Sequence, residues 1–194
     1  MTRTSPVLGL AVLLSASIAP TPAHGDQSAS SREGVCAVLD AHPGWAQAVA
    51  GAANRWGAPP ALLLSFIRQE SNFRAGLGRK AGVYGYAQAA PATWALYRQD
   101  SDRPDADRNN FADSIDFVAW YVSGTLERTG APYSKVAAHY LAYSRGPAPI
   151  GPAHMGSLRN AARVVGYAKA YERDLAACPL ATPPSNTQVA SLGG

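Results

Sequence analysis

One glutamate stands where an apolar helical stripe ends, and its position suits acid–base chemistry. Phe66 and Ile67 belong to this stripe, and Glu70 follows them by four and three residues. That spacing puts the carboxyl group on the same helix face as the core. A carboxyl group on an apolar face loses hydration in its charged form, so we expect its pKa to rise, as a general acid near neutral pH requires. The alternative is a structural glutamate that turns to solvent or pairs with a neighbouring arginine such as Arg68.

Two other segments carry side chains suited to neutral polar substrates. Residues 82–91 read GVYGYAQAAP, with two tyrosines and an uncharged glutamine before a helix start. Residues 138–146 read AHYLAYSRG, a tyrosine-rich helix that runs into a glycine–proline loop. Aromatic rings and amides offer the stacking faces, donors and acceptors that sugars need. Taken singly, however, tyrosines at helical spacing more often belong to a core.

Helices must position these segments, because prolines and glycines divide the chain into stretches of helical periodicity. The predicted helices cover residues 43–56, 59–70, 91–98, 113–128, a stretch that starts with Ser134 as N-cap, and 157–178. Alternating patterns typical of strands are scarce. We therefore expect a mainly α single domain with little β structure, spanning residues 34–178.

Three short motifs follow one another in an order that resembles the lytic transglycosylases. Residues 70–73 (ESNF) are similar to the family's E-S-x-F signature, 85–91 (GYAQAAP) to its G-L-M-Q-x-x-P segment, and 142–146 (AYSRG) to its A-Y-N-x-G segment. The resemblance covers residues 34–178 and implies the lysozyme-like fold shared by soluble lytic transglycosylases and goose-type lysozymes. More narrowly, residues 140–146 resemble the Y-L-A-Y-x-x-G motif of an exported branch, which also shares a D-F-V-x-W-Y helix and an early and a late cysteine.

The resemblance implies a mechanism with a single carboxyl group. Protonated Glu70 would donate to the oxygen that bridges N-acetylmuramic acid and N-acetylglucosamine in peptidoglycan. Glu70 would then take the proton of the muramic C6 hydroxyl, which attacks C1 and gives a 1,6-anhydro end. No water is consumed and no second carboxylate is required, unlike ordinary glycoside hydrolysis.

The resemblance also implies roles for neighbouring residues. Ser71 would orient Glu70, Gln88 would hold an acetamido or hydroxyl group of a sugar, and Tyr143 would form a hydrogen bond near the glutamate. Tyr86 is a further subsite candidate. The family calls for no metal and no cofactor, and the four scattered histidines have no metal-ligand spacing.

Several positions depart from the family pattern. Ala87 replaces the usual methionine, which predicts a roomier and less apolar floor near Glu70. Ser144, also a candidate for substrate binding, and Arg145 stand where most relatives have Asn-x and the closer branch has His-Glu. A hydroxyl reaches less far than an amide. The stretch between Phe73 and Val83 is short, so we expect one wall of the cleft to be reduced.

The two ends of the chain differ in composition from its middle. Residues 1–23 read as a signal peptide, with Arg3, an apolar run of about 13 residues and small residues before His24. That run is shorter than the roughly 20 residues of a spanning helix, although an uncleaved anchor is the alternative. Residues 24–33 read as a linker and 179–194 as a flexible tail. We expect an exported protein, periplasmic or secreted, with no stable membrane insertion after cleavage.

Two cysteines, Cys36 and Cys178, lie near the ends of the predicted domain. In an exported chain an even count favours a disulfide, while two buried free thiols are the alternative. The bond would close a loop of about 140 residues and stabilise the fold by roughly 4–5 kcal/mol. A cysteine-rich zinc site is excluded, since there is no further cysteine.

Composition and net charge limit the classes of partner that the protein can bind. The formal charge is +4, charged residues make up 15% and hydrophobic ones 47%, so disorder throughout is excluded. The basic excess is too small to predict a nucleic-acid partner, but it favours weak attraction to an anionic wall polymer. We expect a monomer that binds peptidoglycan glycan strands.

Two other functions compete with this interpretation. A muramidase of the same fold would need a second carboxylate to activate water, and residues 100–108 (DSDRPDADR) contain four aspartates. Their mixed charges are more typical of a solvated loop. A non-catalytic wall-binding module would keep the fold and lose the chemistry.

Overall fold

The computed structural model describes residues 34–78, 82–145 and 155–180, which all belong to one compact unit, Glu33–Gly194. The predicted signal peptide, the linker and residues 181–194 of the predicted tail lie outside the described residues, and the domain boundaries stay a prediction. In the described part of the chain, no helix is both long and apolar enough to cross a bilayer.

The prediction of a mainly helical domain is confirmed. The described helices are α1 (Val35–Asp40), α2 (Trp45–Trp56), α3 (Pro60–Ser71), α4 (Pro91–Asp100), α5 (Phe111–Thr129), α6 (Val136–Arg145) and α7 (Met155–Ala177). Strand pairing in the same residues is confined to isolated bridges of Tyr84 with Gly78 and with Ala89.

Local backbone chemistry explains where the predicted bounds were wrong. Helix α1 was missed because six residues carry too little periodicity to be recognised. Helix α2 begins at Trp45 rather than Pro43, since Gly44 has a left-handed φ of 89°. Helix α6 begins at Val136, and the amides of its first turn bond to the carbonyl of Lys135, so Ser134 is not its N-cap.

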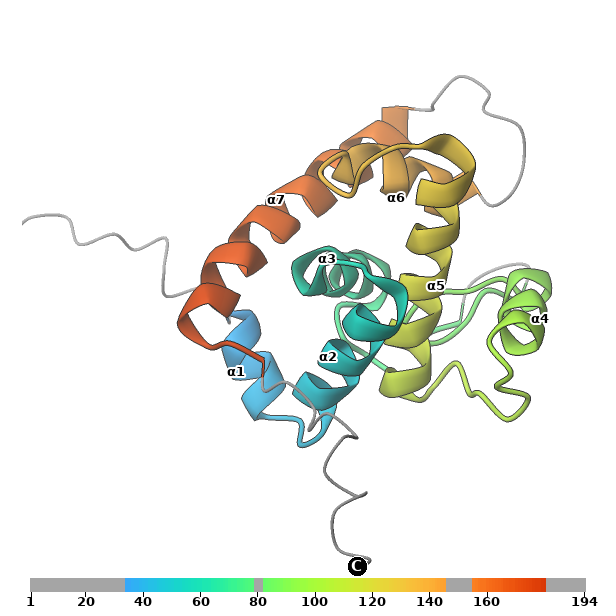
Figure 1. Ribbon diagram of the computed structural model, residues 1–194, viewed down its shortest axis with the longest axis horizontal. Coiled ribbons are helices and arrows are strands. Elements are labelled where there is room, and N and C mark those ends of the chain that lie inside the picture. The colour runs from blue at the N-terminus through green and yellow to red at the C-terminus, as the bar shows by residue number, and fades with distance from the viewer. Residues whose placement is uncertain (1–33, 79–81, 146–154, 181–194) are drawn as a thin grey trace, which may run out of the picture. The chain divides into compact units, whose positions relative to one another are not determined.

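Helices α3 and α5 form the centre of the fold. Helix α3 packs against α7, α2 and α5, and α5 also packs against α2; Figure 1 shows α3 surrounded by these helices. Nine of the twelve α3 residues are buried, among them Leu63, Phe66 and Ile67. Each fully buried side chain of this kind stabilises the fold by roughly 1.5–3 kcal/mol. Glu70 therefore sits on a rigid support.

A buried aspartate joins α2, α4 and α5. Asp116 accepts hydrogen bonds from Trp56 Nε1 at 3.0 Å and from the Tyr97 hydroxyl at 2.8 Å, and it pairs with Arg103 at 3.2 Å. Burial, followed by the charge of Asp116, raises the pKa of Tyr97 well above its ordinary value. The first residue of the D-F-V-x-W-Y segment thus has a structural role.

The expected disulfide is present and the free-thiol alternative is wrong. Cys36 in α1 is bonded to Cys178, which follows α7, across 142 residues of sequence. A hydrogen bond also joins these helices, because Asp174 in α7 accepts from the Val35 amide in α1 at 3.0 Å. The first and last described helices are therefore joined.

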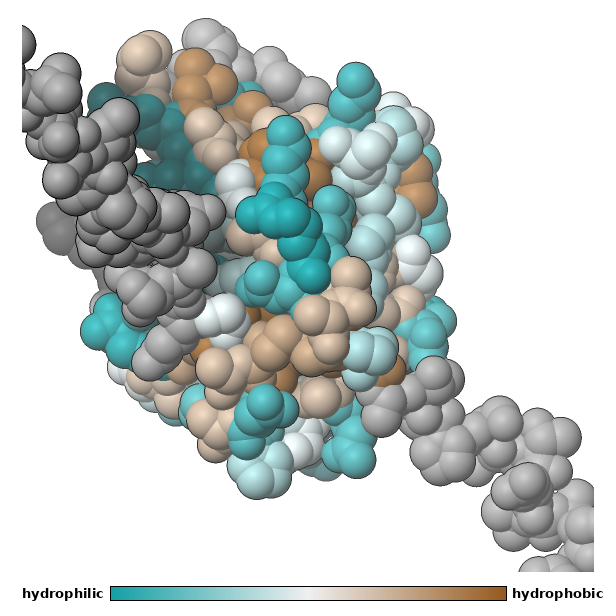
Figure 2. Space-filling view, turned by 90° about the vertical axis from the view of Figure 1, so that its left-hand side faces the viewer, coloured by the Kyte–Doolittle hydropathy of each residue, from teal (hydrophilic) through white to brown (hydrophobic). Residues whose placement is uncertain are grey.

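The outer face of α7 carries exposed charged residues. The basic residues of this helix are all exposed: Arg159, Arg163, Lys169 and Arg173. Figure 2, which views the molecule from the left-hand side of Figure 1, shows hydrophilic residues interspersed with weakly hydrophobic ones.

Candidate active site

The carboxyl group of Glu70 lies in the last turn of α3. Its side chain is buried, with 8% of the residue exposed. The helix ends one residue later, and Asn72 and Phe73 both adopt left-handed backbone angles, with φ of 54° and 60°. Such angles are uncommon for residues other than glycine.

The hydroxyl of Tyr140 in α6 donates a hydrogen bond of 2.7 Å to Glu70 Oε1. Both residues are buried, and the Tyr140 ring packs edge-on against Phe66 of α3 with centroids 5.3 Å apart. This contact holds the carboxyl group in one orientation. Sequence reasoning placed Tyr140 only in the core; its spacing of three residues before Tyr143 was the signal that could have found it.

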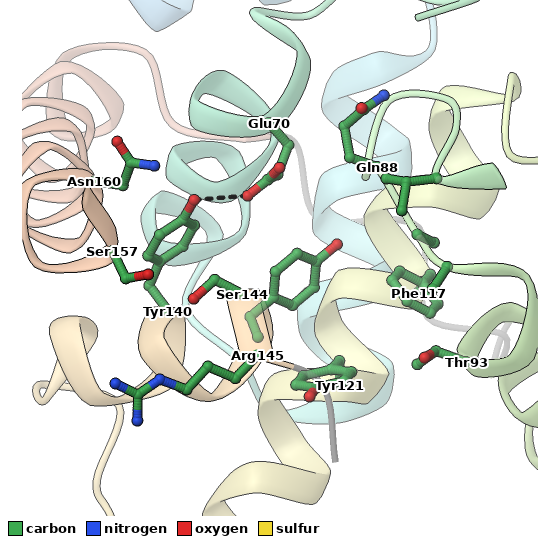
Figure 3. A pocket seen from close by; sticks show the side chains of 14 residues that line it. Glu70, Gln88, Thr93, Phe117, Tyr121, Tyr140, Ser144, Arg145, Ser157 and Asn160 are labelled. Carbon is green, nitrogen blue, oxygen red and sulfur yellow. Dashed lines mark hydrogen bonds between the residues drawn. The ribbon is translucent and has the colours of Figure 1, made fainter. Parts of the chain in front are cut away.

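A cavity of about 770 Å³ opens in front of Glu70. Its walls come from α3, the 83–90 segment, α4, α5, α6 and the start of α7. Figure 3 shows the Tyr140 hydroxyl directed at Glu70 from one side, with Gln88 on the other side of the carboxyl group. Among the described lining residues, Glu70 is the only carboxylate. Thr93, Ser157 and Asn160 also line the cavity and were not predicted.

Gln88 is fixed by its own turn. Its Nε2 donates hydrogen bonds of 2.8 Å to the carbonyls of Leu77 and Gly85, and its backbone has a left-handed φ of 48°. These two bonds determine which end of the amide is nitrogen. The Oε1 atom is buried without a hydrogen-bond partner, and the residue lines the Glu70 cavity. An acceptor is thus left for a ligand.

Tyr143 and Ser144 also lie on the cavity wall. The Tyr143 hydroxyl donates to the carbonyl of Ala87 at 2.5 Å rather than to Glu70. Burial, and then the negative charge of Glu70, raises the pKa of Tyr143 well above its ordinary value. Tyr143 is therefore a neutral phenol throughout the physiological range. Ser144 is exposed, and its hydroxyl donates to the Leu141 carbonyl at 3.2 Å.

The remaining candidates from the sequence lie outside the cavity wall. The Ser71 hydroxyl donates to the Ile67 carbonyl of its own helix at 3.2 Å. Tyr86 packs edge-on against Trp45 and Phe111, with centroids 5.6 Å away in both cases. Ala87 is almost fully buried and is not a lining residue, so its small side chain does not enlarge the cavity floor as predicted.

The aspartates of residues 100–107 do not line the Glu70 cavity. Asp102 and Asp105 are exposed, and Asp107 accepts a hydrogen bond from the Asn109 amide at 2.9 Å. Asp100 lines a different cavity, between α4 and α5. No group of three or more His, Cys, Asp or Glu side chains within the described ranges could hold a metal ion.

Comparison with protein-family profiles shows to which family the chain belongs. The profile of the transglycosylase SLT domain matches residues 7–178, which is most of the chain. This chain is a member of the transglycosylase SLT domain family. Comparison with curated proteins finds no match.

Membership in the transglycosylase SLT family gives the site its general chemistry. The family acts on peptidoglycan by cleaving its glycan, so the chain is a glycan-cleaving enzyme with peptidoglycan as its substrate. Its place of action is the cell wall, which favours export. The cavity in front of Glu70 is the described feature whose size and polar lining fit such a substrate.

Proposed function

We propose that the chain is a lytic transglycosylase that cleaves the β-1,4 bond between N-acetylmuramic acid and N-acetylglucosamine without water, with Glu70 as its only acid and base. The observation that carries this proposal is that Glu70, which is buried and accepts a hydrogen bond from Tyr140, supplies the only carboxyl group among the described lining residues of a cavity of about 770 Å³. A hydrolase that inverts or retains would require a second carboxylate about 5–9.5 Å away. The described lining residues supply none.

The reaction would proceed in two proton transfers through Glu70. The protonated acid donates to the bridging oxygen while the bond to the muramic C1 breaks, and positive charge develops at the ring. The Tyr140 hydroxyl, 2.7 Å away, then stabilises the resulting carboxylate. That carboxylate takes the proton of the muramic C6 hydroxyl, whose oxygen forms the new bond to C1. Glu70 ends protonated, ready for the next bond.

Other side chains on the cavity wall would bind the sugars. Gln88 Oε1 is positioned to accept a hydrogen bond from an acetamido N–H or a sugar hydroxyl, because its Nε2 is already occupied. Ser144 would supply a hydroxyl at the rim, and the ring of Tyr143 an apolar wall. Ser71 would act indirectly, by stabilising the last turn of α3. Tyr86 would also act indirectly, by packing the 83–90 segment against Trp45 and Phe111. The sequence predicts that the exported protein works as a monomer in the periplasm or outside the cell.

Mass spectrometry of fragments released from purified peptidoglycan tests the proposal. We expect 1,6-anhydromuramic ends, which are lighter by one water than hydrolytic products. Reducing ends instead would make the chain a muramidase, and binding without release would make it a wall-binding module.

A Glu70→Gln variant tests the catalytic role directly. We expect release to fall by at least about 10²–10⁴-fold, the usual contribution of a general acid. Its melting temperature should stay close to that of the wild type, because the amide can still accept a hydrogen bond from Tyr140. An active Glu70→Gln variant would remove the central claim.

A further inference from the structure

A second cavity adjoins the one in front of Glu70. It measures about 310 Å³, lies between α4 and α5, and shares Thr93 and Tyr121 with the first cavity. The two cavities are therefore neighbours. Its other lining residues are Leu96, Asp100, Trp120, Gly124, Glu127 and Arg128. Of these, only Trp120 belongs to a motif of the family resemblance, the D-F-V-x-W-Y segment.

One wall of the second cavity is apolar and partly open. Leu96 on α4 is 51% exposed. Trp120 is half-buried, and its ring is held between Tyr97 and Phe117, each with a centroid 5.7 Å away. This wall is rigid, so it can accept an apolar chain without losing much side-chain freedom.

Charges of both signs also line the second cavity. Asp100 and Glu127 supply carboxylates and Arg128 a guanidinium, and all three are exposed. Arg128 donates to Thr125 Oγ1 at 3.3 Å and lies 5.9 Å from the centre of the Tyr121 ring. These contacts hold the guanidinium back along α5, toward Tyr121, which is one of the two residues that the cavities share.

Gly124 provides the room for this guanidinium. A Cβ atom at position 124 would lie 2.9 Å from Arg128 Nη1, closer than real contacts allow. Glycine inside a helix costs about 1 kcal/mol relative to alanine. The position of the Arg128 side chain therefore depends on the absence of a side chain at Gly124.

We propose that the second cavity binds the stem peptide of peptidoglycan, through a residue that carries an ammonium and a carboxylate. This inference rests on the proposed function. The sugars of the strand are neutral apart from their peptide substituents, so they gain little from a wall with charges of both signs. A zwitterionic amino-acid end places its carboxylate on Arg128, its ammonium on Asp100 and Glu127, and its aliphatic part on Leu96 and Trp120.

Binding of a free stem peptide with a C-terminal diamino acid tests this directly. In NMR titrations of the full protein we expect the Trp120 indole N–H signal, assigned with a Trp120→Phe variant, to shift on peptide addition. Arg128→Gln should weaken binding about five- to twentyfold, equivalent to roughly 1–1.8 kcal/mol. Arg98→Gln is the matched control, because Arg98 is exposed on α4 and does not line the cavity.

The proposed contact of Asp100 and Glu127 with the ammonium needs a separate experiment. N-acetylation of the diamino acid removes the ammonium, so it should weaken binding to the wild type. In an Asp100→Asn/Glu127→Gln double variant we expect acetylation to have no further effect, since the two changes remove the same interaction. Equal losses in both proteins would overturn this half of the proposal.

A Gly124→Ala variant separates binding from stability. The added methyl group pushes the flexible Arg128 side chain away, while alanine favours the helix. We expect an unchanged or higher melting temperature together with weaker peptide binding. A variant with unchanged peptide affinity would contradict the role given to Arg128.

Two substrates distinguish this inference from the proposed function. Arg128→Gln should lower kcat/KM on peptide-bearing strands but not on strands whose peptides have been removed. Equal loss on both substrates, or a Trp120 shift with peptide-free glycan alone, would make the cavity a sugar subsite and overturn the inference. If no anhydro ends form but peptide binding still depends on Arg128, the proposed function fails and this inference stands.

Discussion

Glu70 and Tyr140 are separated by 70 residues in the sequence, yet their side chains share a 2.7 Å hydrogen bond. A hydroxyl that donates to a carboxylate stabilises its charged form. In the proposed reaction this interaction is strongest after the first proton transfer, when Glu70 is negative. Tyr140 is therefore a positioning residue whose effect should fall on the rate of the chemical step.

Replacement of Tyr140 by phenylalanine should lower kcat about 10–100-fold, since a hydrogen bond to a charged group contributes roughly 1.5–3 kcal/mol. KM should change little, because the hydroxyl contacts Glu70. Losing the donor also favours the protonated acid, so the alkaline limb of the pH–rate profile should move to higher pH. Initial rates of fragment release across pH measure both effects.

A Tyr133→Phe variant is the control for this experiment. The Tyr133 hydroxyl also donates to a partner, the Trp56 carbonyl at 3.3 Å, but Tyr133 does not line the Glu70 cavity. We expect normal rates and a normal pH profile from it. If Tyr140→Phe behaves in the same way, Tyr140 has no part in positioning Glu70.

At the scale of elements, the turn that carries Gln88 depends on one glycine. Gly85 has a φ of 82°, and a Cβ atom there would lie 2.0 Å from the backbone oxygen of Arg108. The same oxygen accepts a hydrogen bond from the Tyr86 amide at 3.1 Å. The turn is thus pressed against the segment before α5, and backbone cannot move aside as a side chain can.

Gly85→Ala should therefore lower the free energy of unfolding by roughly 2–4 kcal/mol, from the left-handed angle and the clash together. Activity should fall further than the fraction of folded protein, because Gln88 moves with the turn. Urea denaturation and fragment release measure the two effects. Gly166→Ala on α7, where nothing lies within 4 Å of the added Cβ, should instead be neutral or stabilise by up to about 1 kcal/mol.

At the scale of the molecule, the Cys36–Cys178 disulfide joins α1 to the residue after α7. Reduction should lower the melting temperature. The bond restricts the unfolded chain, and its loss should lower the free energy of unfolding by at most about 4–5 kcal/mol. Thermal melts with and without reductant measure this. A Cys36→Ser/Cys178→Ser variant should melt at the lower temperature and show no response to reductant; an equal response in both proteins would assign the effect to something other than this bond.

Buried tyrosines predict a loss of stability in alkali. Burial raises the pKa of Tyr97, Tyr121 and Tyr143, and it raises the pKa of Tyr171 to about 12. The unfolded chain ionises near the ordinary value of 10.0 while the folded state keeps its protons. Stability from these groups is therefore complete below about pH 10 and is lost as pH rises through the folded values.

Urea midpoints measured from neutral pH to about pH 12, together with phenolate absorbance, check this prediction. We expect the midpoint to fall from about pH 10 upward, and phenolate absorbance to rise cooperatively with unfolding. A constant midpoint across this range, with gradual ionisation of the folded protein, would contradict it.

Much of the architecture could be predicted because its signals are local. The start of α3 at Pro60 and the end of α5 before Gly130 are marked by residue type, and both helices lie within one or two residues of the predicted bounds. Glu70 was found because periodicity fixes which face of a helix a residue occupies. The six-residue α1 and the start of α6 were predicted wrongly, since short segments and caps carry weak signals.

The sequence by itself determined most of the helices, the helix face on which Glu70 lies and the motifs by which the family is recognised, because each depends on residues close together in the chain. Only the tertiary structure decided that Tyr140 rather than Tyr143 donates to Glu70, that the buried Oε1 of Gln88 keeps no hydrogen-bond partner, and that a charged second cavity adjoins the first. These features join α3, α4, α5 and α6, and contacts between distant segments follow from packing, which local periodicity does not specify.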